Sequence, residues 1–144
     1  KIPIFNSILK RAGFIFVDRK NNDSAIRSMN YLLEDIKKIP RSVGIFPEGT
    51  RSKDGNFLQF KKGAAIFGIN TKIPIVPIAI SGTYDWSQKK IFDFSQTIIT
   101  FEFGEPIICN NLTYDDRDSL TKRIKDSIKG MKIDWDEIFT KKQL

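Results

Sequence analysis

Short apolar runs typical of buried strands alternate along this chain with stretches that have the apolar spacing of helices. The runs predict strands at residues 14–17, 42–46, 73–80 and 97–103, the last nearer to a sheet edge. The other patterns predict helices at residues 3–12, 24–36, 63–70 and 115–130. Strands that are apolar on both faces and separated by helices are typical of parallel sheets. We therefore predict an α/β fold with a mostly parallel central sheet flanked by helices.

The chain has the length and continuity of one domain. No internal repeat, linker or shift of composition divides its 144 residues. A chain of this length can bury a core without disulfides or metal. We therefore predict a single domain over residues 1–144. The sequence starts at Lys1 rather than Met, within a helical pattern, so we expect this domain to be truncated at its amino terminus.

The charge balance is strongly basic, with 24 Lys and Arg residues against 17 Asp and Glu residues and a net charge of +7. Such an excess favours nucleic acid, phosphorylated metabolites or an acidic lipid surface as partners. The basic residues are dispersed and the aromatic residues lie mostly in strand patterns, so we expect no nucleic-acid partner. The longest apolar run, residues 73–80, is far shorter than the roughly twenty residues of a membrane-spanning helix.

Histidine is absent from the chain, and Cys109 is its only cysteine. Catalysis by an imidazole base is therefore excluded within these residues, and so is metal binding by histidine. Zinc sites need more thiolate or imidazole ligands than one cysteine provides, and no acidic cluster indicates Mg²⁺. We therefore predict no metal site and no histidine-based catalysis in this chain.

The most informative loop follows the predicted strand at residues 42–46. Gly49 allows the backbone to approach an anion closely, Thr50 offers a hydroxyl, and Arg51 offers a planar fork of donors suited to phosphate. A loop at the carboxyl end of a parallel strand is where α/β folds bind ligands. A second interpretation fits equally well: Glu48 and Arg51 pair locally, and the loop is only a solvated turn.

Other basic residues fall near this loop in the predicted sheet. Arg19 follows the strand at residues 14–17, so that it and Arg51 would emerge on one rim if the two strands are neighbours, unless Arg19 forms only a surface ion pair with Asp18. Lys61 precedes a predicted helix whose amino terminus favours anions, although such lysines are often merely solvated. The aromatic residues at 57 and 60, with Leu58, form either an apolar or membrane-facing patch or, for Phe60 at least, part of the core.

Four segments resemble, in order, the blocks of the 1-acyl-glycerol-3-phosphate acyltransferase (lysophosphatidate acyltransferase) family. FPEGTRS at residues 46–52 matches the F-P-E-G-T-R-S block, and GFIFVDR at residues 13–19 is similar to the G-x-x-F-I-D-R block, with Val17 for Ile. Residues 60–64 (FKKGA) resemble the basic segment that follows, and residues 76–80 (VPIAI) resemble the last, proline-containing strand. The blocks cover about half of the chain.

The resemblance implies a glycerolphosphate acyltransferase-like fold and an enzyme of phospholipid biosynthesis. The reaction would transfer a fatty acyl group from acyl-CoA or acyl-carrier protein to 1-acyl-glycerol-3-phosphate, giving phosphatidate without any further cofactor. It implies membrane association on the cytoplasmic face, with an anionic membrane surface as partner. The substrate-binding residues would be Arg19, Glu48, Gly49, Thr50, Arg51 and Lys61. The acyl-donor side would include Pro77.

This sequence departs from the family at its first block, H-x-x-x-x-D, whose histidine acts as the general base. No histidine is present, so we expect that block upstream of Lys1 and expect this chain to be inactive alone. The alternative is a non-catalytic relic of the same family that binds anionic lipid. An H-x-x-x-x-D block upstream would indicate the enzyme, and its absence the relic.

Overall fold

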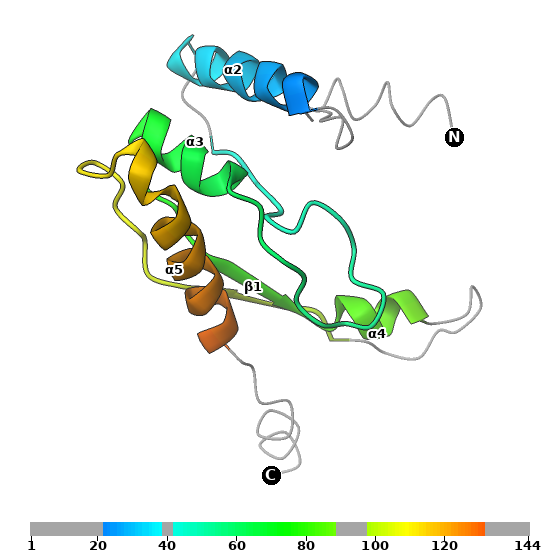
Figure 1. Cartoon of the computed structure of the whole chain (residues 1–144). Coiled ribbons are helices and arrows are strands. Elements are labelled where there is room, and N and C mark those ends of the chain that lie inside the picture. Colours follow the sequence, from blue (N-terminus) through cyan, green and yellow to red (C-terminus); the bar gives the residue numbers. More distant parts are fainter. Residues whose placement is uncertain (1–21, 39–41, 89–97, 132–144) are drawn as a thin grey trace. The chain divides into compact units, whose positions relative to one another are not determined.

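The computed structural model describes residues 22–38, 42–88 and 98–131 (Figure 1). The chain divides into two compact units. The first unit spans Lys1–Ile45 and the second spans Phe46–Leu144. The prediction of one domain over residues 1–144 stays a prediction. The expected helix at residues 3–12 and the expected strand at residues 14–17 lie outside the described residues.

In the first unit, helix α2 spans Asn22–Lys38 and confirms the helix expected at residues 24–36. Its apolar positions recur every three or four residues, which places them along one face. Ile36 on that face is buried and Leu33 is half-buried, whereas Arg27 and Tyr31 are exposed. Among the side chains of α2 that the structure describes, the most buried one thus lies on the face that the sequence pattern predicts.

The second unit contains a pair of antiparallel strands, β1 (Ile78–Ser81) and β2 (Thr100–Phe103). Their register aligns Ile78 with Phe103 and Ser81 with Thr100, and an antiparallel bridge between Ile75 and Ile107 extends the pairing. The strands expected at residues 73–80 and 97–103 are thus present in shortened form. Their antiparallel pairing does not confirm the mostly parallel sheet, which stays a prediction for the remaining strands.

The expected strand at residues 42–46 is wrong for the described chain, because these residues have no regular secondary structure. A β-strand exists only where its backbone pairs with a neighbour. The strand expected beside it, residues 14–17, lies outside the described residues. An apolar run such as SVGIF predicts a preference for extended backbone but does not provide the partner.

The two faces of the β1–β2 pair differ in burial, contrary to the expectation of strands buried on both faces. Ala79 is buried, whereas Ile78 and Ile80 are exposed. Their partners Phe103 and Phe101 are 67% and 59% exposed, so this face is apolar and open in the part of the chain that the structure describes. Side chains alternate between the faces of a strand, which places these four on the same face.

Two helices cover the core of the second unit: α3 (Gly63–Thr71) and α5 (Arg117–Gly130), which pack against each other (Figure 1). The short 3₁₀ helix η1 (Tyr114–Asp116) precedes α5. Both α-helices confirm the helices expected at residues 63–70 and 115–130. A further short helix, α4 (Thr83–Gln88), follows β1 and was not predicted.

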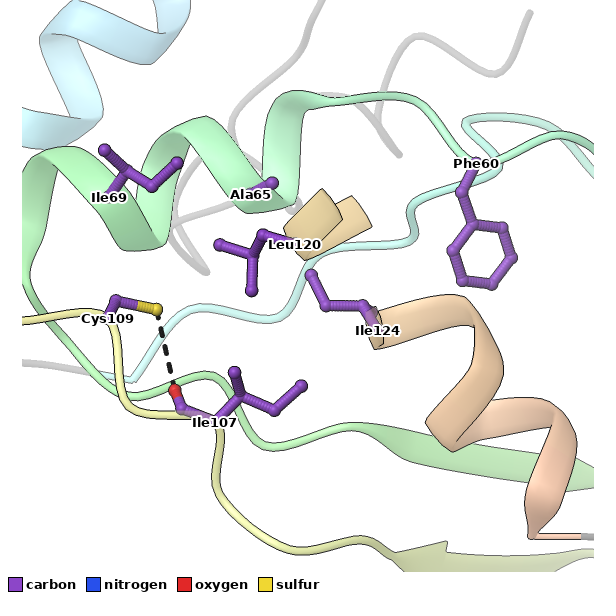
Figure 2. Close-up of a cluster of buried hydrophobic side chains, with 7 residues drawn as sticks. All are labelled: Phe60, Ala65, Ile69, Ile107, Cys109, Leu120 and Ile124. Carbon is purple, nitrogen blue, oxygen red and sulfur yellow. Dashed lines mark hydrogen bonds between the residues drawn. The ribbon is translucent and has the colours of Figure 1, made fainter. Parts of the chain in front are cut away.

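A cluster of buried side chains joins α3, α5 and the segment that follows β2 (Figure 2). Leu120 and Ile124 of α5 point into the space between α3 and the chain around Cys109. The thiol of Cys109 has no exposed surface, and burial raises its pKa. The members of the cluster are Phe60, Ala65, Ile69, Ile107, Cys109, Leu120 and Ile124.

Gly68 allows α3 to approach this core closely. A methyl group at its Cα would lie 2.6 Å from Cδ1 of Ile75 and 3.0 Å from Sγ of Cys109. Both distances are shorter than a normal van der Waals contact, so a larger residue would displace Ile75 or push α3 outward. The missing side chain at position 68 therefore sets how α3 sits on the rest of the unit.

We predict that Gly68→Ala lowers the free energy of unfolding by about 1–3 kcal/mol through overpacking. The matched control is Gly130→Ala, at the last residue of α5, where a methyl group would meet nothing within 4 Å. The control should be neutral or slightly stabilising, because alanine favours helix more than glycine does. Urea unfolding of both variants tests this, and equal stability of the two would contradict the close approach at Gly68.

Candidate functional site

The loop after residue 46 begins with a tight turn over residues 46–49. The amide of Gly49 donates a hydrogen bond to the carbonyl oxygen of Phe46 across 3.1 Å. Pro47 at the second position fixes its own φ near the value that such a turn needs. Gly49 has φ +69°, a left-handed conformation that glycine adopts without steric cost. The Pro-Glu-Gly sequence therefore reverses the chain immediately before Thr50 and Arg51.

The residues from 58 to 62 lie against this turn. The amide of Lys61 donates a hydrogen bond of 2.8 Å to the carbonyl oxygen of Pro47. The Lys61 side chain then passes over Gly49: a methyl group on Gly49 would lie 3.4 Å from Cδ and Cε of Lys61 and 3.7 Å from Nζ. The lysine therefore lies within van der Waals distance of the turn, with its ammonium group beside Gly49.

Between these two segments lies an open depression of about 510 Å³, which we call the loop depression. Its lining combines one carboxylate, one hydroxyl and two ammonium groups with apolar and amide side chains. The lining residues are Glu48, Thr50, Leu58, Gln59, Phe60, Lys61 and Lys62. Lys62 is also the residue before α3, whose amino terminus no side chain caps. The positive end of the helix dipole adds to the two lysines and favours an anion here.

Arg51 follows the lining residue Thr50, and its side chain is exposed. In the part of the chain that the structure describes, no carboxylate lies within ion-pair distance of Arg51, so the expected alternative of a Glu48–Arg51 pair is not formed. The guanidinium therefore remains available to a ligand. Arg19 lies outside the described residues, so the expectation that it shares a rim with Arg51 stays a prediction.

The chain beyond Arg51 is held by a cluster of hydrogen bonds on Asp54. Its carboxylate accepts hydrogen bonds from the Asn56 side chain at 3.0 Å and from the Ser52 hydroxyl at 2.8 Å. These bonds, together with one from the Asn56 amide, lower the pKa of Asp54 to about 2. The carboxylate thus stays ionised, and the turn that follows Arg51 keeps its acceptor at any pH well above 2.

The loop also packs on α4. The ring of Tyr84 lies against Gly55, where an added methyl group would be 3.2 Å from the ring carbons Cγ and Cδ1. The Tyr84 hydroxyl is 3.4 Å from the carbonyl oxygen of Lys53. Helix α4 therefore supports the far end of the loop whose near end carries Arg51.

Phe60 fixes the other side of the loop depression, because its ring belongs to the buried core. This confirms the core interpretation for Phe60, whereas Phe57 is half exposed and meets Phe60 edge-on at 6.3 Å between ring centres. Lys61 and Lys62 follow directly, so the packing of Phe60 sets where both ammonium groups begin. The interpretation of Phe57, Leu58 and Phe60 as one exposed patch is therefore wrong for Phe60.

Pro77 lies elsewhere in the second unit, immediately before β1. Its side chain is fully buried, and its carbonyl oxygen accepts a hydrogen bond of 2.9 Å from the amide of Gly104. It does not line the loop depression. The structure thus gathers Glu48, Gly49, Thr50 and Lys61 in one place, with Arg51 next to them in sequence, and keeps Pro77 apart.

Of the lysine pair before the predicted helix, sequence reasoning selected Lys61 but not Lys62, and it did not find Gln59. The available signal was the position of Lys62 directly before a predicted helix, where an anion is favoured. Nothing in the local pattern marks Gln59, because its place depends on the bond between Lys61 and Pro47. Within the described ranges, no three acidic or cysteine side chains gather to hold a metal ion. None of the helices described there is long and apolar enough to cross a membrane.

Comparison with known proteins identifies a family whose members this chain resembles. The family model described as "Acyltransferase" matches residues 1–81, more than half of the chain. The chain is 36% identical over 124 residues to the 1-acyl-sn-glycerol-3-phosphate acyltransferase of Limnanthes douglasii, covering 86% of this chain and 44% of that protein. It is 33% identical over 129 residues to the enzyme of the same name from Saccharomyces cerevisiae, covering 88% and 43%.

A solved structure is similar as well. The crystal structure of the 1-acyl-sn-glycerophosphate acyltransferase from Thermotoga maritima superposes with a TM-score of 0.65 at 26% identity. That match covers 94% of this chain and 54% of the other. The human 1-acyl-sn-glycerol-3-phosphate acyltransferase alpha is 35% identical over 117 residues, or 81% of this chain and 41% of the human protein. The chain thus spans less than half the length of the plant, yeast and human relatives and 54% of the Thermotoga maritima chain.

Proposed function

Because this chain belongs to the acyltransferase family, we propose that it serves the transfer of a fatty acyl group to the hydroxyl of 1-acyl-glycerol-3-phosphate, giving phosphatidate. The names of the relatives support this acceptor. The observation that carries the proposal is the loop depression, where Lys61 lies against Gly49, two residues before the exposed side chain of Arg51. The same names describe enzymes, which does not favour the alternative of a non-catalytic lipid-binding relic.

The loop depression suits the phosphate end of the acceptor. A phosphomonoester carries up to two negative charges, and the ammonium group of Lys61 supplies opposite charge at the depression, next to that of Lys62, which also pairs with Asp118. The Thr50 hydroxyl and the amide groups at the start of α3 are further donors. Glu48 contributes the one carboxylate of the lining, and we propose that it orients the glycerol part of the acceptor by hydrogen bonding. We propose Arg19 as a second guanidinium for the phosphate, by its resemblance to the family.

The reaction also needs a base for the acceptor hydroxyl, which is weakly nucleophilic at neutral pH. The chain contains no histidine. The proposal therefore assigns substrate binding, and not proton transfer, to these residues. The acyl thioester enters as a co-substrate without any further cofactor, and we propose that the strand after Pro77 belongs to its side of the site.

Arg51 provides the sharpest test of the phosphate site. Arg51→Ala should weaken binding of glycerol 3-phosphate at least about tenfold, because a charge-assisted hydrogen bond contributes roughly 1.5–3 kcal/mol. The affinity of Arg51→Lys should lie between those of the unaltered chain and Arg51→Ala, since lysine keeps the charge and loses the fork of donors. Arg123→Ala, which removes another exposed arginine, from α5, is the matched control. Isothermal titration gives the affinities, and thermal unfolding gives the stability of each variant.

Two results would contradict this assignment. The first is an unchanged affinity of Arg51→Ala with a large fall in melting temperature, which would make Arg51 structural. The second is an equal loss in Arg123→Ala, which would mean that only the net charge matters.

We further propose that the chain contacts an anionic membrane surface, on the cytoplasmic face where such lipids lie. The net charge of +7 supports this, as do Lys122, Arg123 and Lys129, which are exposed on α5. Each nearby basic residue contributes about 1 kcal/mol at such a surface.

Co-sedimentation with vesicles tests this contact. The chain should sediment with anionic vesicles at low salt and much less at high salt, because salt screens surface charge. Neutral vesicles are the control. Equal, salt-independent binding to both kinds of vesicle would contradict the electrostatic contact.

A further inference from the structure

Helix α5 reaches the loop depression through Lys125. The ammonium group of Lys125 donates a hydrogen bond of 3.3 Å to the carbonyl oxygen of Leu58. The same nitrogen lies 5.5 Å from the ring centre of Phe60, within the range of a cation–π contact. Leu58 and Phe60 both line the depression, but Lys125 does not. This lysine therefore contacts two lining residues without lining the depression itself.

A second residue of α5 touches the same segment. Asp118 pairs with Lys62 across 2.6 Å, and this bond lowers the pKa of Asp118. The two side chains are 60% and 51% exposed, and ion pairs this exposed contribute little. The Lys125 side chain is partly buried, and its bond is made to main-chain oxygen. Of the two contacts, the one made by Lys125 is the stronger constraint on the position of the segment.

The helix that carries Lys125 is itself fixed. Ile124, the preceding residue, and Leu120 are buried in the core with Phe60. The core therefore sets the position of the Lys125 backbone, and its side chain spans the short remaining distance to Leu58. A change at Lys125 should thus move the segment at residues 58–61 while leaving the core packing in place.

We propose that Lys125 is a positioning residue for the anion site: it holds the segment at residues 58–61 so that Lys61 stays over Gly49. Lys125 makes no contact with the ligand in this account and acts through the backbone of Leu58 and the ring of Phe60. The inference rests on the proposed function for its ligand, a phosphomonoester. It goes beyond the family resemblance, because α5 lies outside the residues that the family model matches.

Three variants of the 144-residue chain test the inference, with glycerol 3-phosphate as the probe. Lys125→Met removes the hydrogen bond and the charge while keeping the length of the side chain. Lys125→Arg keeps a cationic donor and should therefore retain the affinity for glycerol 3-phosphate. Lys122→Met is the control for charge, because it removes one positive charge from the same helix at a residue whose ammonium group pairs with Asp126 instead. Affinity is measured at low and high salt, with hydrogen exchange of the Lys61 amide as a local readout.

We expect Lys125→Met to weaken binding about fivefold to tenfold, less than the loss of a charge-assisted hydrogen bond to the ligand itself, because Lys125 acts on the ligand only through the position of Lys61. The loss of affinity should shrink at high salt together with the attraction between Lys61 and the phosphate, whereas the change in exchange of the Lys61 amide should persist. The Lys61 amide, bonded to Pro47, should exchange faster by a similar factor, whereas the amide of Ile69 in the core should not change. Lys125→Arg should restore both quantities to within about twofold.

Several outcomes would overturn the inference. Unchanged exchange of the Lys61 amide in Lys125→Met would show that Lys125 does not hold the segment. An equal, salt-sensitive loss of affinity in Lys122→Met would show that Lys125→Met weakens binding only by removing a positive charge. A failure of the unaltered chain to bind glycerol 3-phosphate would instead contradict the proposed function. Exchange of the Lys61 amide would still decide whether Lys125 positions the segment.

Discussion

The packing of α3 and α5 around one apolar cluster is the constraint on which the rest of the second unit depends. The cluster includes Phe60, which lies outside both helices, and Cys109, which lies in the segment after β2. Gly68 allows α3 to come close enough for Ile75 and Cys109 to fill the contact. Burial of apolar surface drives this packing, and it fixes the chain on both sides of the lysine pair.

That packing fixes the backbone position of the residues that form the candidate site. Phe60 is held in the core, so Lys61 starts from a fixed backbone position, and its amide meets the carbonyl oxygen of Pro47. The turn at residues 46–49 is thereby tied to the segment that leads into α3. Polar groups at the surface take their positions from buried side chains nearby. This is how a loop that is mostly exposed can present a defined set of charges.

The helices could be predicted from the sequence because their apolar spacing is a local property. The periodic residues Leu120 and Ile124 predicted the buried face of α5 correctly. Strand direction could not be predicted, because pairing between Ile78 and Phe103 joins residues far apart in the chain. The same difference between local patterns and tertiary contacts applies to the candidate site. Glu48, Gly49 and Thr50 were found together as a motif, whereas the approach of Lys61 and the contact of Lys125 depend on tertiary packing.

The central claim is that a phosphomonoester binds where the turn at residues 46–49 meets the lysine segment. Backbone amide shifts followed by NMR during titration with glycerol 3-phosphate test it most directly. The account predicts saturable shifts concentrated at Gly49, Thr50, Arg51 and at residues 61–64, with the exposed face of β1 and β2 unaffected. Shifts spread evenly over the basic surface, or concentrated on α5 away from the loop depression, would contradict it.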